Sequence, residues 1–307
     1  MPSYVYGPVP SRRLGSSLGV DLVPHKTCTF DCIYCQLGPC EETTTVRAEY
    51  VPIDEVVEQV RERLEEGDRP DYVTLGGSGE PTLHSGFGEV ARRIRSFTDT
   101  PICLLSNGSL FHRPEVRADC GAIDLIIPSL DAPDPETFRR INRPNPAITF
   151  ERLVEGLVAL REEFDGEIWL EVFLLSGIND TDGHVVGFKE LIERIRPDRV
   201  QLNTAVRPPA EEEAQPVPAS RMEEIRTALG PPAEVIARVE GHHHPPAPTV
   251  DEEAVIQMLR RRPCTVQDVA EGLGAHENEI IKCLRDLAER GRVRTTRTGG
   301  RLFYHAD

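Results

Sequence analysis

The chain of 307 residues lacks a long hydrophobic run. No stretch of about 18 consecutive apolar residues occurs, so no membrane-spanning helix and no membrane partner are expected. The first residues, Met1 to Tyr4, do not form a basic segment followed by an apolar one, as a secretory signal peptide would require. The cytoplasm is therefore the expected location. The chain also lacks an internal repeat beyond an alternation of strand-like and helix-like segments.

Positive charge is scarce, because 35 Lys and Arg face 51 Asp and Glu, for a net charge of −16. Residues 250–307 are balanced, so the acidic excess lies in residues 1–249. Such a surface repels nucleic acid over most of its area and leaves only local basic patches for RNA or DNA. Acidity that serves solubility alone remains the alternative explanation.

A disulfide framework is also missing. Of the eight cysteines, three share one short loop, Cys40 follows that loop, and the other four, Cys103, Cys120, Cys264 and Cys283, are scattered. Ligands plus buried thiols fit this distribution, and they fit a reducing compartment. The scattered cysteines lack the close spacing of a second cluster site.

The loop from Lys26 to Cys35 carries the clearest chemical pattern. Cys28, Cys32 and Cys35 stand at C-x3-C-x2-C spacing, with Tyr34 directly before the third. Three thiolates this close can converge on one soft metal centre and leave one coordination position open. On the loop alone, a zinc site with Cys40 as fourth ligand remains the alternative.

Three polar motifs end consecutive strand-like runs. Gly76 to Pro81 follows the run Tyr72 to Leu75, Ser106 to Gly108 ends the next, and Ser129 to Asp131 ends the one after. In barrel-like folds the functional site lies at this edge of the strands. The alternatives are a plain turn, Asn-Gly turn chemistry, and helix capping by Asp131 or Asp134.

Two further strand-like runs end in Asn179-Asp180 and in Gln201 and Asn203. Polar residues at several strand ends on one rim are what a site on that rim requires. Each of them could instead cap a helix.

The cysteine spacing resembles the cluster-binding signature of the radical S-adenosylmethionine (radical SAM) superfamily. The segment Gly76 to Glu80 resembles its Gly-Gly-Glu element, here with Ser78 inserted. The resemblance implies that Cys28, Cys32 and Cys35 hold a [4Fe-4S] cluster whose fourth iron is chelated by S-adenosylmethionine (SAM). It also implies an electron donor of flavodoxin or ferredoxin type and reductive cleavage of SAM to a 5′-deoxyadenosyl radical. Cys40 is then a bystander.

The same resemblance assigns the SAM contacts. The glycines would let backbone approach SAM, Glu80 would face its ammonium group, and the later motifs would face its ribose or carboxylate. The residues assigned in this way are Tyr34, Gly76, Gly77, Gly79, Glu80, Ser106, Asn107, Ser129 and Asp131.

A narrower resemblance covers residues 4–208. Gly7 to Gly15, the cysteine loop and Gly79 to His84 together resemble an uncharacterised subgroup related to the wyosine-base-forming tRNA enzymes and, more distantly, to nitrogenase cofactor assembly enzymes. The chain departs from these relatives because it has no long basic insertion and no second cysteine cluster. Neither relative's substrate therefore carries over.

The alternation of short β-branched runs with amphipathic helices predicts an α/β fold with a parallel sheet. Six strands are expected, at residues 18–23, 72–75, 102–105, 125–129, 168–175 and 199–203, with helices at 53–64, 87–97, 114–118, 150–164, 184–195 and 221–229. The number and order suit an open partial (β/α)6 TIM-like barrel. A doubly wound sheet fits the pattern as well. Tyr6 to Gly15, rich in Pro and Gly, is expected to be a loop near the site.

Three domain segments are expected: residues 1–240 as the barrel, 241–249 as a Pro- and His-rich linker, and 250–307 as a winged helix-turn-helix. The C-terminal segment should contain helices at 252–261, 266–272 and 277–290 and a two-stranded wing at 291–304. His242 to His244 could bind metal, although a solvated linker explains them too.

Basic residues stand out in so acidic a chain. Those in the first domain are Arg12, Arg13, Lys26, Arg139, Arg140, Arg143 and Arg207, and those near the C-terminus are Lys282, Arg285, Arg290, Arg292, Arg294, Arg297 and Arg301. The first group could clamp a phosphate or carboxylate, or could form ordinary surface ion pairs. The second group could engage nucleic acid or protein.

The function expected from these features is that of a radical SAM enzyme acting on an unidentified substrate, which could be nucleic acid, nucleotide-like or a peptide. The winged helix is expected to be a substrate or partner module outside the catalytic core, engaging RNA or a peptide. The alternative is a non-catalytic iron-sulfur sensor that binds nucleic acid through the winged helix, although a SAM-binding rim argues against it.

Overall fold

A computed structural model describes residues 3–11, 13–35, 37–40, 42–205, 211, 213–236, 250–261, 263–273, 275–298 and 301–306. Arg12, Arg207 and the expected linker at 241–249, with its three histidines, lie outside the described residues.

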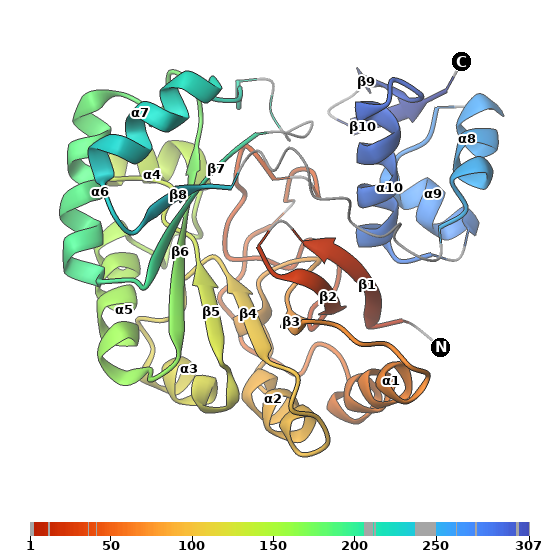
Figure 1. The fold of residues 1–307 in the computed structure, drawn as a ribbon, viewed down its shortest axis with the longest axis horizontal. Coiled ribbons are helices and arrows are strands. Elements are labelled where there is room, and N and C mark those ends of the chain that lie inside the picture. The colour runs from red at the N-terminus through yellow and green to blue at the C-terminus, as the bar shows by residue number, and fades with distance from the viewer. Residues whose placement is uncertain are drawn as a thin grey trace.

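One eight-stranded sheet forms the centre of the molecule, and its strands follow one another in chain order (Figure 1). They are β1 (Val5–Ser11), β2 (Gly15–Val20), β3 (Tyr72–Leu75), β4 (Ile102–Ser106), β5 (Leu125–Pro128), β6 (Glu167–Leu174), β7 (Arg199–Thr204) and β8 (Ala233–Val235). Strands β2 to β8 are parallel, and β1 pairs antiparallel with β2. A doubly wound sheet would reverse its strand order at a switch point, so the sequential order supports the partial barrel.

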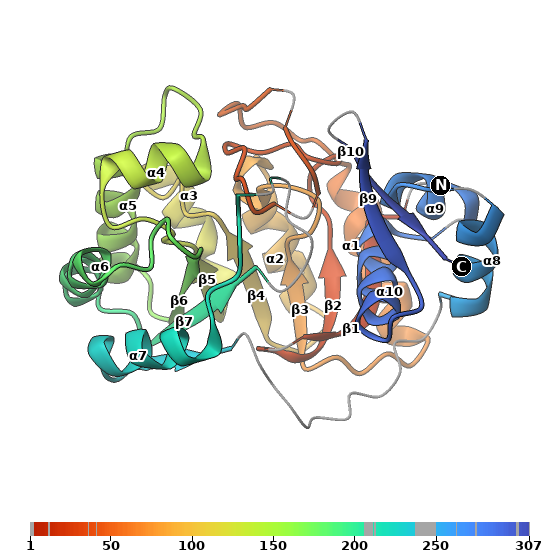
Figure 2. The same cartoon turned by 90° about the horizontal axis from the view of Figure 1, so that it is seen from above.

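Helices cover the outer face of this sheet (Figures 1 and 2). They are α1 (Ile53–Glu65), α2 (Phe87–Arg95), α3 (Pro114–Ala118), α5 (Phe150–Glu163), α6 (Asp182–Ile195) and α7 (Ala219–Leu229). Alternate strand residues such as Leu18, Val73 and Leu104 pack beneath them in the main core. Their neighbours point to the inner face, which carries polar side chains as well as apolar ones.

The predicted parallel strands and the helices around them are confirmed, with small shifts at their ends, and one α-helix and two strands were missed. Helix α4 (Pro135–Asn142) begins with the cap residue Asp134, which accepts bonds from the amides of Glu136 and Thr137. Strands β1 and β8 extend the two sides of the sheet.

The prediction of a loop at Tyr6 to Gly15 is wrong, because Val5–Ser11 is a strand. Its prolines are tolerated because β1 is an edge strand, so one side of its backbone makes no ladder. The pairing of β1 with β2 also shifts register between Tyr6 and Val9, as at a bulge.

A C-terminal unit, here residues 250–306, contains α8 (Glu252–Arg261), α9 (Val266–Leu273), α10 (Glu277–Glu289) and the hairpin β9 (Arg294–Thr298) and β10 (Arg301–His305). These elements follow the predicted order. Val255, Leu259, Ile280 and Leu284 belong to a hydrophobic core separate from that of the sheet. Cys264 and Tyr304 exchange backbone hydrogen bonds and tie the hairpin to the helices.

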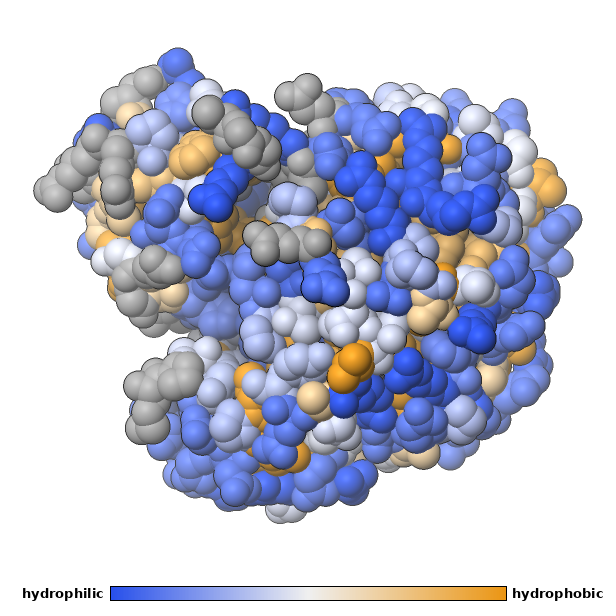
Figure 3. All heavy atoms as spheres, turned by 180° about the vertical axis from the view of Figure 1, so that it is seen from behind, coloured by the Kyte–Doolittle hydropathy of each residue, from blue (hydrophilic) through white to orange (hydrophobic). Residues whose placement is uncertain are grey.

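The face shown in Figure 3 is mostly hydrophilic, with hydrophobic residues scattered over it. Among the described residues, no helix combines the length and the apolar character needed to cross a membrane.

Candidate active site

A cavity of about 450 Å³ opens at the carboxyl ends of the parallel strands. Ser17, Thr74, Leu105 and Ile127 line it from successive strands of the inner face. Ser17 and Thr74 share a hydrogen bond of 2.7 Å between their hydroxyls. The predicted site residues that line the cavity are Cys28, Cys32, Tyr34, Cys35, Gly76, Gly77, Gly79, Glu80, Ser106, Asn107 and Ser129. Asp131 does not line it.

The cysteine loop is held from two sides by backbone hydrogen bonds. On one side, the Lys26 amide donates to the Ser78 carbonyl at 2.6 Å, and the Glu80 amide donates to the Thr27 carbonyl at 3.0 Å. On the other, the Ile33 amide donates to the Ile141 carbonyl at 3.0 Å, near the end of α4. The position of the loop is therefore set by contacts within the chain.

Each of the three thiols has a nitrogen donor nearby. Asn107 Nδ2 lies 3.5 Å from Cys28 Sγ, and Asn142 Nδ2 lies 3.4 Å from Cys32 Sγ. Lys26 forms a hydrogen bond with Cys35. Donors to sulfur stabilise thiolates and tune a metal centre that the thiolates bind.

Charge on the thiols of Cys28 and Cys32 is costly without a bound cation. Burial, followed by the charge of Glu80, raises the pKa of Cys28 to about 12. Burial and Asp131 hold the pKa of Cys32 well above its usual range. Burial tends to lower the pKa of Lys26, but the nearby thiols, Cys35 above all, outweigh it and leave that pKa raised. The site is built to receive a positively charged group that displaces the thiol protons.

Cys40 does not take part in this arrangement. Its thiol is directed at the carbonyls of Lys26 and Glu42, at 3.4 and 3.2 Å, and it does not line the cavity. Within the described part of the chain, no three His, Cys, Asp or Glu side chains converge closely enough to hold a single metal ion. A structural zinc needs four donors at about 2.3 Å from one point. The three thiols line the cavity without a fourth from Cys40, so the four-cysteine zinc site considered from the sequence is not formed.

Glu80 is almost fully buried and holds two loops together. Its Oε1 accepts bonds from the Thr82 amide at 3.0 Å, the Thr82 hydroxyl at 2.5 Å and the Ser106 hydroxyl at 2.8 Å, and its Oε2 accepts one from the Asn107 amide at 2.7 Å. Burial raises the pKa of this carboxyl, and these hydrogen bonds oppose the rise. Its first task is thus structural, and Oε2 keeps a lone pair for one more donor.

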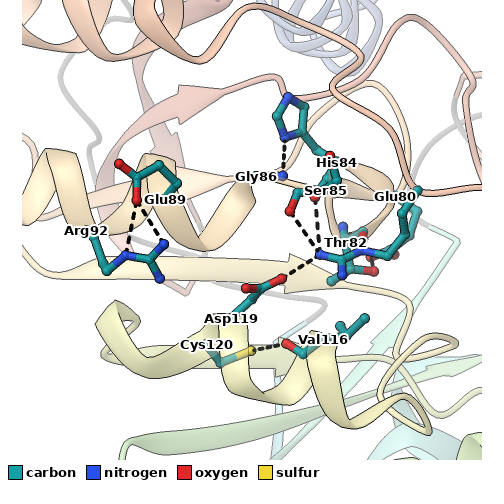
Figure 4. Close-up of polar contacts among 11 residues, drawn as sticks. Glu80, Thr82, His84, Ser85, Gly86, Glu89, Arg92, Val116, Asp119 and Cys120 are labelled. Atoms are coloured by element: carbon teal, nitrogen blue, oxygen red, sulfur yellow. Dashed lines mark hydrogen bonds and ion pairs between the residues drawn. The ribbon is translucent and has the colours of Figure 1, made fainter.

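The short helix that follows Glu80, Pro81–Leu83, is braced from outside (Figure 4). Arg47 donates to the carbonyls of Thr82, His84 and Ser85 and lies 2.6 Å from Asp119 Oδ2. This bracing holds Glu80 at the rim of the cavity.

The glycines of the Gly76–Glu80 loop are required by packing within the chain. Gly76 has φ of +149°, a conformation that L-residues rarely adopt. A Cβ on Gly77 would lie 2.1 Å from Asp21 Oδ1, and one on Gly79 would lie 2.1 Å from the Thr27 carbonyl. From the sequence, these glycines are expected to let the backbone approach SAM. At Gly77 and Gly79, the group that approaches closely is another part of the chain.

Asp131 lies behind the cavity wall and not in it. Its carboxylate accepts bonds from Tyr34 Oη at 2.5 Å, Asn142 Nδ2 at 2.7 Å and the Phe173 amide at 3.2 Å. Burial raises its pKa to about 6, against these bonds. Tyr34 also stacks on Phe173, with ring centroids 4.0 Å apart. Asp131 therefore positions Tyr34 and Asn142, and the direct ribose contact expected of it is not available.

The remaining predicted residues divide between cavity and framework. Asn203 lines the cavity, whereas Gln201 donates to Glu234 and Asn179 donates to the carbonyls of Asp131 and Phe173. Arg140 and Arg143 form ion pairs with Glu213 and Glu211, as ordinary surface residues would.

Sequence reasoning missed Asp21, Asn142 and Glu171. Glu171 lines the cavity, lies 3.1 Å from Arg13 Nη1, and accepts a bond from Asn203. Asp21 accepts two bonds from Ser78. The sequence could have indicated Asp21 and Glu171. Each carboxylate lies inside an apolar run and needs a hydrogen-bond or ion-pair partner when that run is buried.

The C-terminal unit packs directly against this site. The Asn278 amide donates to His276 Nδ1, so the ring proton lies on Nε2, which contacts Asp21 Oδ2 at 2.7 Å. The His276 ring also stacks on Tyr6 at 4.4 Å, and Tyr6 Oη donates to the Gly76 carbonyl. One histidine thus touches two of the residues that hold the Gly76–Glu80 loop, Tyr6 and Asp21. This differs from the expectation of a module outside the core.

Two other contacts fix the same helix end. The Gly7 amide donates to Glu279 Oε1 at 3.0 Å, and His25 Nδ1 lies 2.5 Å from Glu277 Oε2. Figures 1 and 2 both show α10 beside β1.

The chain is similar to known proteins over most of its length. The model of the radical SAM superfamily matches residues 22–188. The UPF0026 protein MJ1312 of Methanocaldococcus jannaschii is 30% identical over 309 residues, covering 97% of this chain and 94% of that protein. A protein named GTPase Obg from Brachyspira hyodysenteriae is 40% identical over 303 residues, covering 98% of this chain, which spans only 45% of that longer protein. The structure of TYW1 with a lysine-pyruvate adduct bound matches with a TM-score of 0.51 and 20% identity, over 69% of this chain and 72% of the other.

The first prediction concerns Gly79. Gly79→Ala should lower the free energy of unfolding by about 1–3 kcal/mol, because its Cβ would collide with the backbone of the cysteine loop. Chemical denaturation measures this. The matched control is Gly121→Ala, where nothing lies within 4 Å of the added Cβ. Equal stability of the two variants would contradict the packing described here.

The second prediction concerns His276. His276→Ala should speed hydrogen exchange at the Ser78 and Glu80 amides roughly fivefold, as expected if local opening costs about 1 kcal/mol less. Mass-spectrometric exchange resolves this segment. His184→Ala, which removes a histidine from α6 that contacts Thr181, is the control and should leave these amides unchanged. Unaltered exchange in both variants would show that the C-terminal unit does not support the loop.

Proposed function

Because the chain belongs to the radical SAM superfamily and, within it, to the family of the UPF0026 proteins, we propose that its cavity is where SAM is cleaved and a substrate is attacked. The chain is a radical SAM superfamily enzyme, and the cofactors of that superfamily are a [4Fe-4S] cluster and SAM. When bound, they supply a 5′-deoxyadenosyl radical that abstracts hydrogen from a substrate.

The observation that carries the proposal is that Cys28, Cys32 and Cys35 line one cavity together with the Gly76–Glu80 loop, while Cys40 is turned away. Three thiolates leave one iron of a four-iron cluster without a protein ligand. The residues present fit such a cluster, since each thiol also has a nitrogen donor nearby.

In this proposal the polypeptide has three tasks. The three cysteines hold the cluster, and Asn107, Asn142 and Lys26 stabilise its sulfur ligands. Tyr34, Ser106, Ser129, Glu80 and the glycine loop shape the SAM side of the cavity, with Glu80 Oε2 offered to the SAM ammonium. Asp131 acts through Tyr34 and Asn142.

We also propose the type of electron donor, the extent of the barrel and the class of the C-terminal unit. The electron donor is of the flavodoxin or ferredoxin type, and six of the seven parallel strands in the described part of the chain, β2 to β7, form a (β/α)6 partial barrel. The order of helices and hairpin in residues 250–306 is that of a winged helix-turn-helix.

The first test is reconstitution with iron and sulfide without oxygen. The wild-type chain should bind about four iron and four sulfide per chain. Cys28→Ala, Cys32→Ala and Cys35→Ala should each lose the cluster, whereas Cys40→Ala should retain it. Iron and sulfide analysis with absorption spectra measures this. Retention of zinc without iron, or cluster loss in Cys40→Ala, would refute the assignment.

The second test is turnover of SAM. Reduced, reconstituted protein should convert SAM to 5′-deoxyadenosine, which chromatography detects. Cys40→Ala should retain this conversion and Cys32→Ala should abolish it. Intact cluster with no 5′-deoxyadenosine from any reductant would mean that the cluster serves another purpose, such as sensing.

A further inference from the structure

Helix α10 forms one wall of the cavity. Asn278, Ile281, Lys282 and Arg285 line the cavity together with the three cysteines and the Gly76–Glu80 loop. Their spacing of three, four and seven residues places them on one face of the helix. The opposite side of the helix supplies Ile280, Leu284 and Leu287 to the core of its own unit.

The position of this wall is set by specific contacts. His276 joins Asp21 and Tyr6, Glu279 accepts from the Gly7 amide, and Asn278 Nδ2 lies 3.5 Å from Asp21 Oδ2. Asp21 and Tyr6 in turn hold Ser78 and Gly76. The cavity is therefore completed by the C-terminal unit and is not formed by the sheet alone.

The wall is basic, in contrast to a chain whose net charge is −16. Among the described cavity-lining residues, the only acids are Glu80 and Glu171, both from the sheet side. Glu171 faces Arg13, and Glu80 is held by hydrogen bonds. On the α10 side the charged groups are Lys282 and Arg285.

Arg285 is partly balanced by acids of its own helix. Its Nε donates to Asp286 Oδ1 at 2.7 Å and lies 3.7 Å from Glu289 Oε1. Both acids are considerably exposed, at 43% and 60%. A guanidinium oriented in this way still has nitrogens to offer an anion in the cavity.

We propose that Lys282 and Arg285 bind an anionic group, phosphate or carboxylate, of the substrate, which is a small molecule or the end of a larger one. This rests on the proposed function, because it places the substrate in the cavity where SAM is cleaved. The cavity of about 450 Å³ also receives the cluster and SAM, so only a small molecule or the end of a larger one fits beside them.

The same geometry argues against reading of duplex DNA by this unit. In a helix-turn-helix, the second helix presents its N-terminal residues to the bases. Here those residues, His276 to Glu279, are engaged by β1, Tyr6 and Asp21. The helix face that would read bases is the wall of the cavity.

The experiment uses the reconstituted full-length protein with SAM, at fixed ionic strength and without oxygen. Titration calorimetry measures binding of two probes, pyrophosphate and citrate, so that the phosphate and carboxylate sources are distinguished. Lys282→Gln and Arg285→Gln should each weaken binding of the preferred probe about tenfold or more, because each removes a charge-assisted contact. Lys282→Arg, which keeps the positive charge, should retain most of the wild-type affinity.

The matched control is Arg292→Gln, which removes an exposed positive charge from the same unit outside the cavity lining and should leave affinity unchanged. Thermal denaturation of every variant separates lost binding from lost folding. Binding of neither probe to the wild type, or equal affinity in Lys282→Gln and Arg292→Gln, would overturn the proposal. The proposal would also be overturned if neither probe binds but an RNA oligonucleotide does, and Lys282→Gln weakens the binding of that RNA. Cluster content and SAM cleavage of the wild type are measured in parallel, so failure of the proposed function is seen separately.

Discussion

The structure depends on a backbone contact between two loops. The Lys26 amide reaches the Ser78 carbonyl and the Glu80 amide reaches the Thr27 carbonyl, so the cysteine loop and the glycine loop form one rim. Such a contact needs the two backbones close together, and only a residue without Cβ fits at Gly79. The thiols and the glycine loop therefore face the same cavity because neither loop can move without the other.

Around this contact, two buried acids serve as junctions. Glu80 joins its own loop to the turn at Ser106–Asn107, and Asp21 joins Ser78 to His276 of the C-terminal unit. Burying a carboxylate is unfavourable unless several donors surround it, and each of these acids has several. The cost of burial thus enforces the geometry, since any displacement leaves charge without partners. This links the C-terminal unit to a loop that lies more than 190 residues earlier in the chain.

Local patterns explain why much of this could be anticipated. Parallel strands appear as short β-branched runs, and the polar motifs after them fall on one rim because the carboxyl ends of parallel strands share an edge. The placement of Cys28, Cys32, Cys35 and Ser129 in the cavity follows from this rule. The rule does not predict the direction of a side chain. It therefore did not distinguish Asn203, which lines the cavity, from Gln201, which does not. A second rule, that proline and glycine mark a loop, gave the wrong result for β1. The effect of proline on a strand depends on whether the strand lies at an edge of the sheet, which the sequence does not show.

The sequence by itself determined the chemistry of the site, through three thiols at a fixed spacing. It also determined the order of strands and helices and the charge balance of the C-terminal segment in an acidic chain. These are local properties, readable from neighbours along the chain. Only the tertiary structure decided that Asp131 supports Tyr34 from behind the wall, that Asn142 approaches Cys32, and that α10 closes the cavity. Each of these depends on contacts between residues far apart in the chain, which form only when the sheet, its loops and the C-terminal unit pack together.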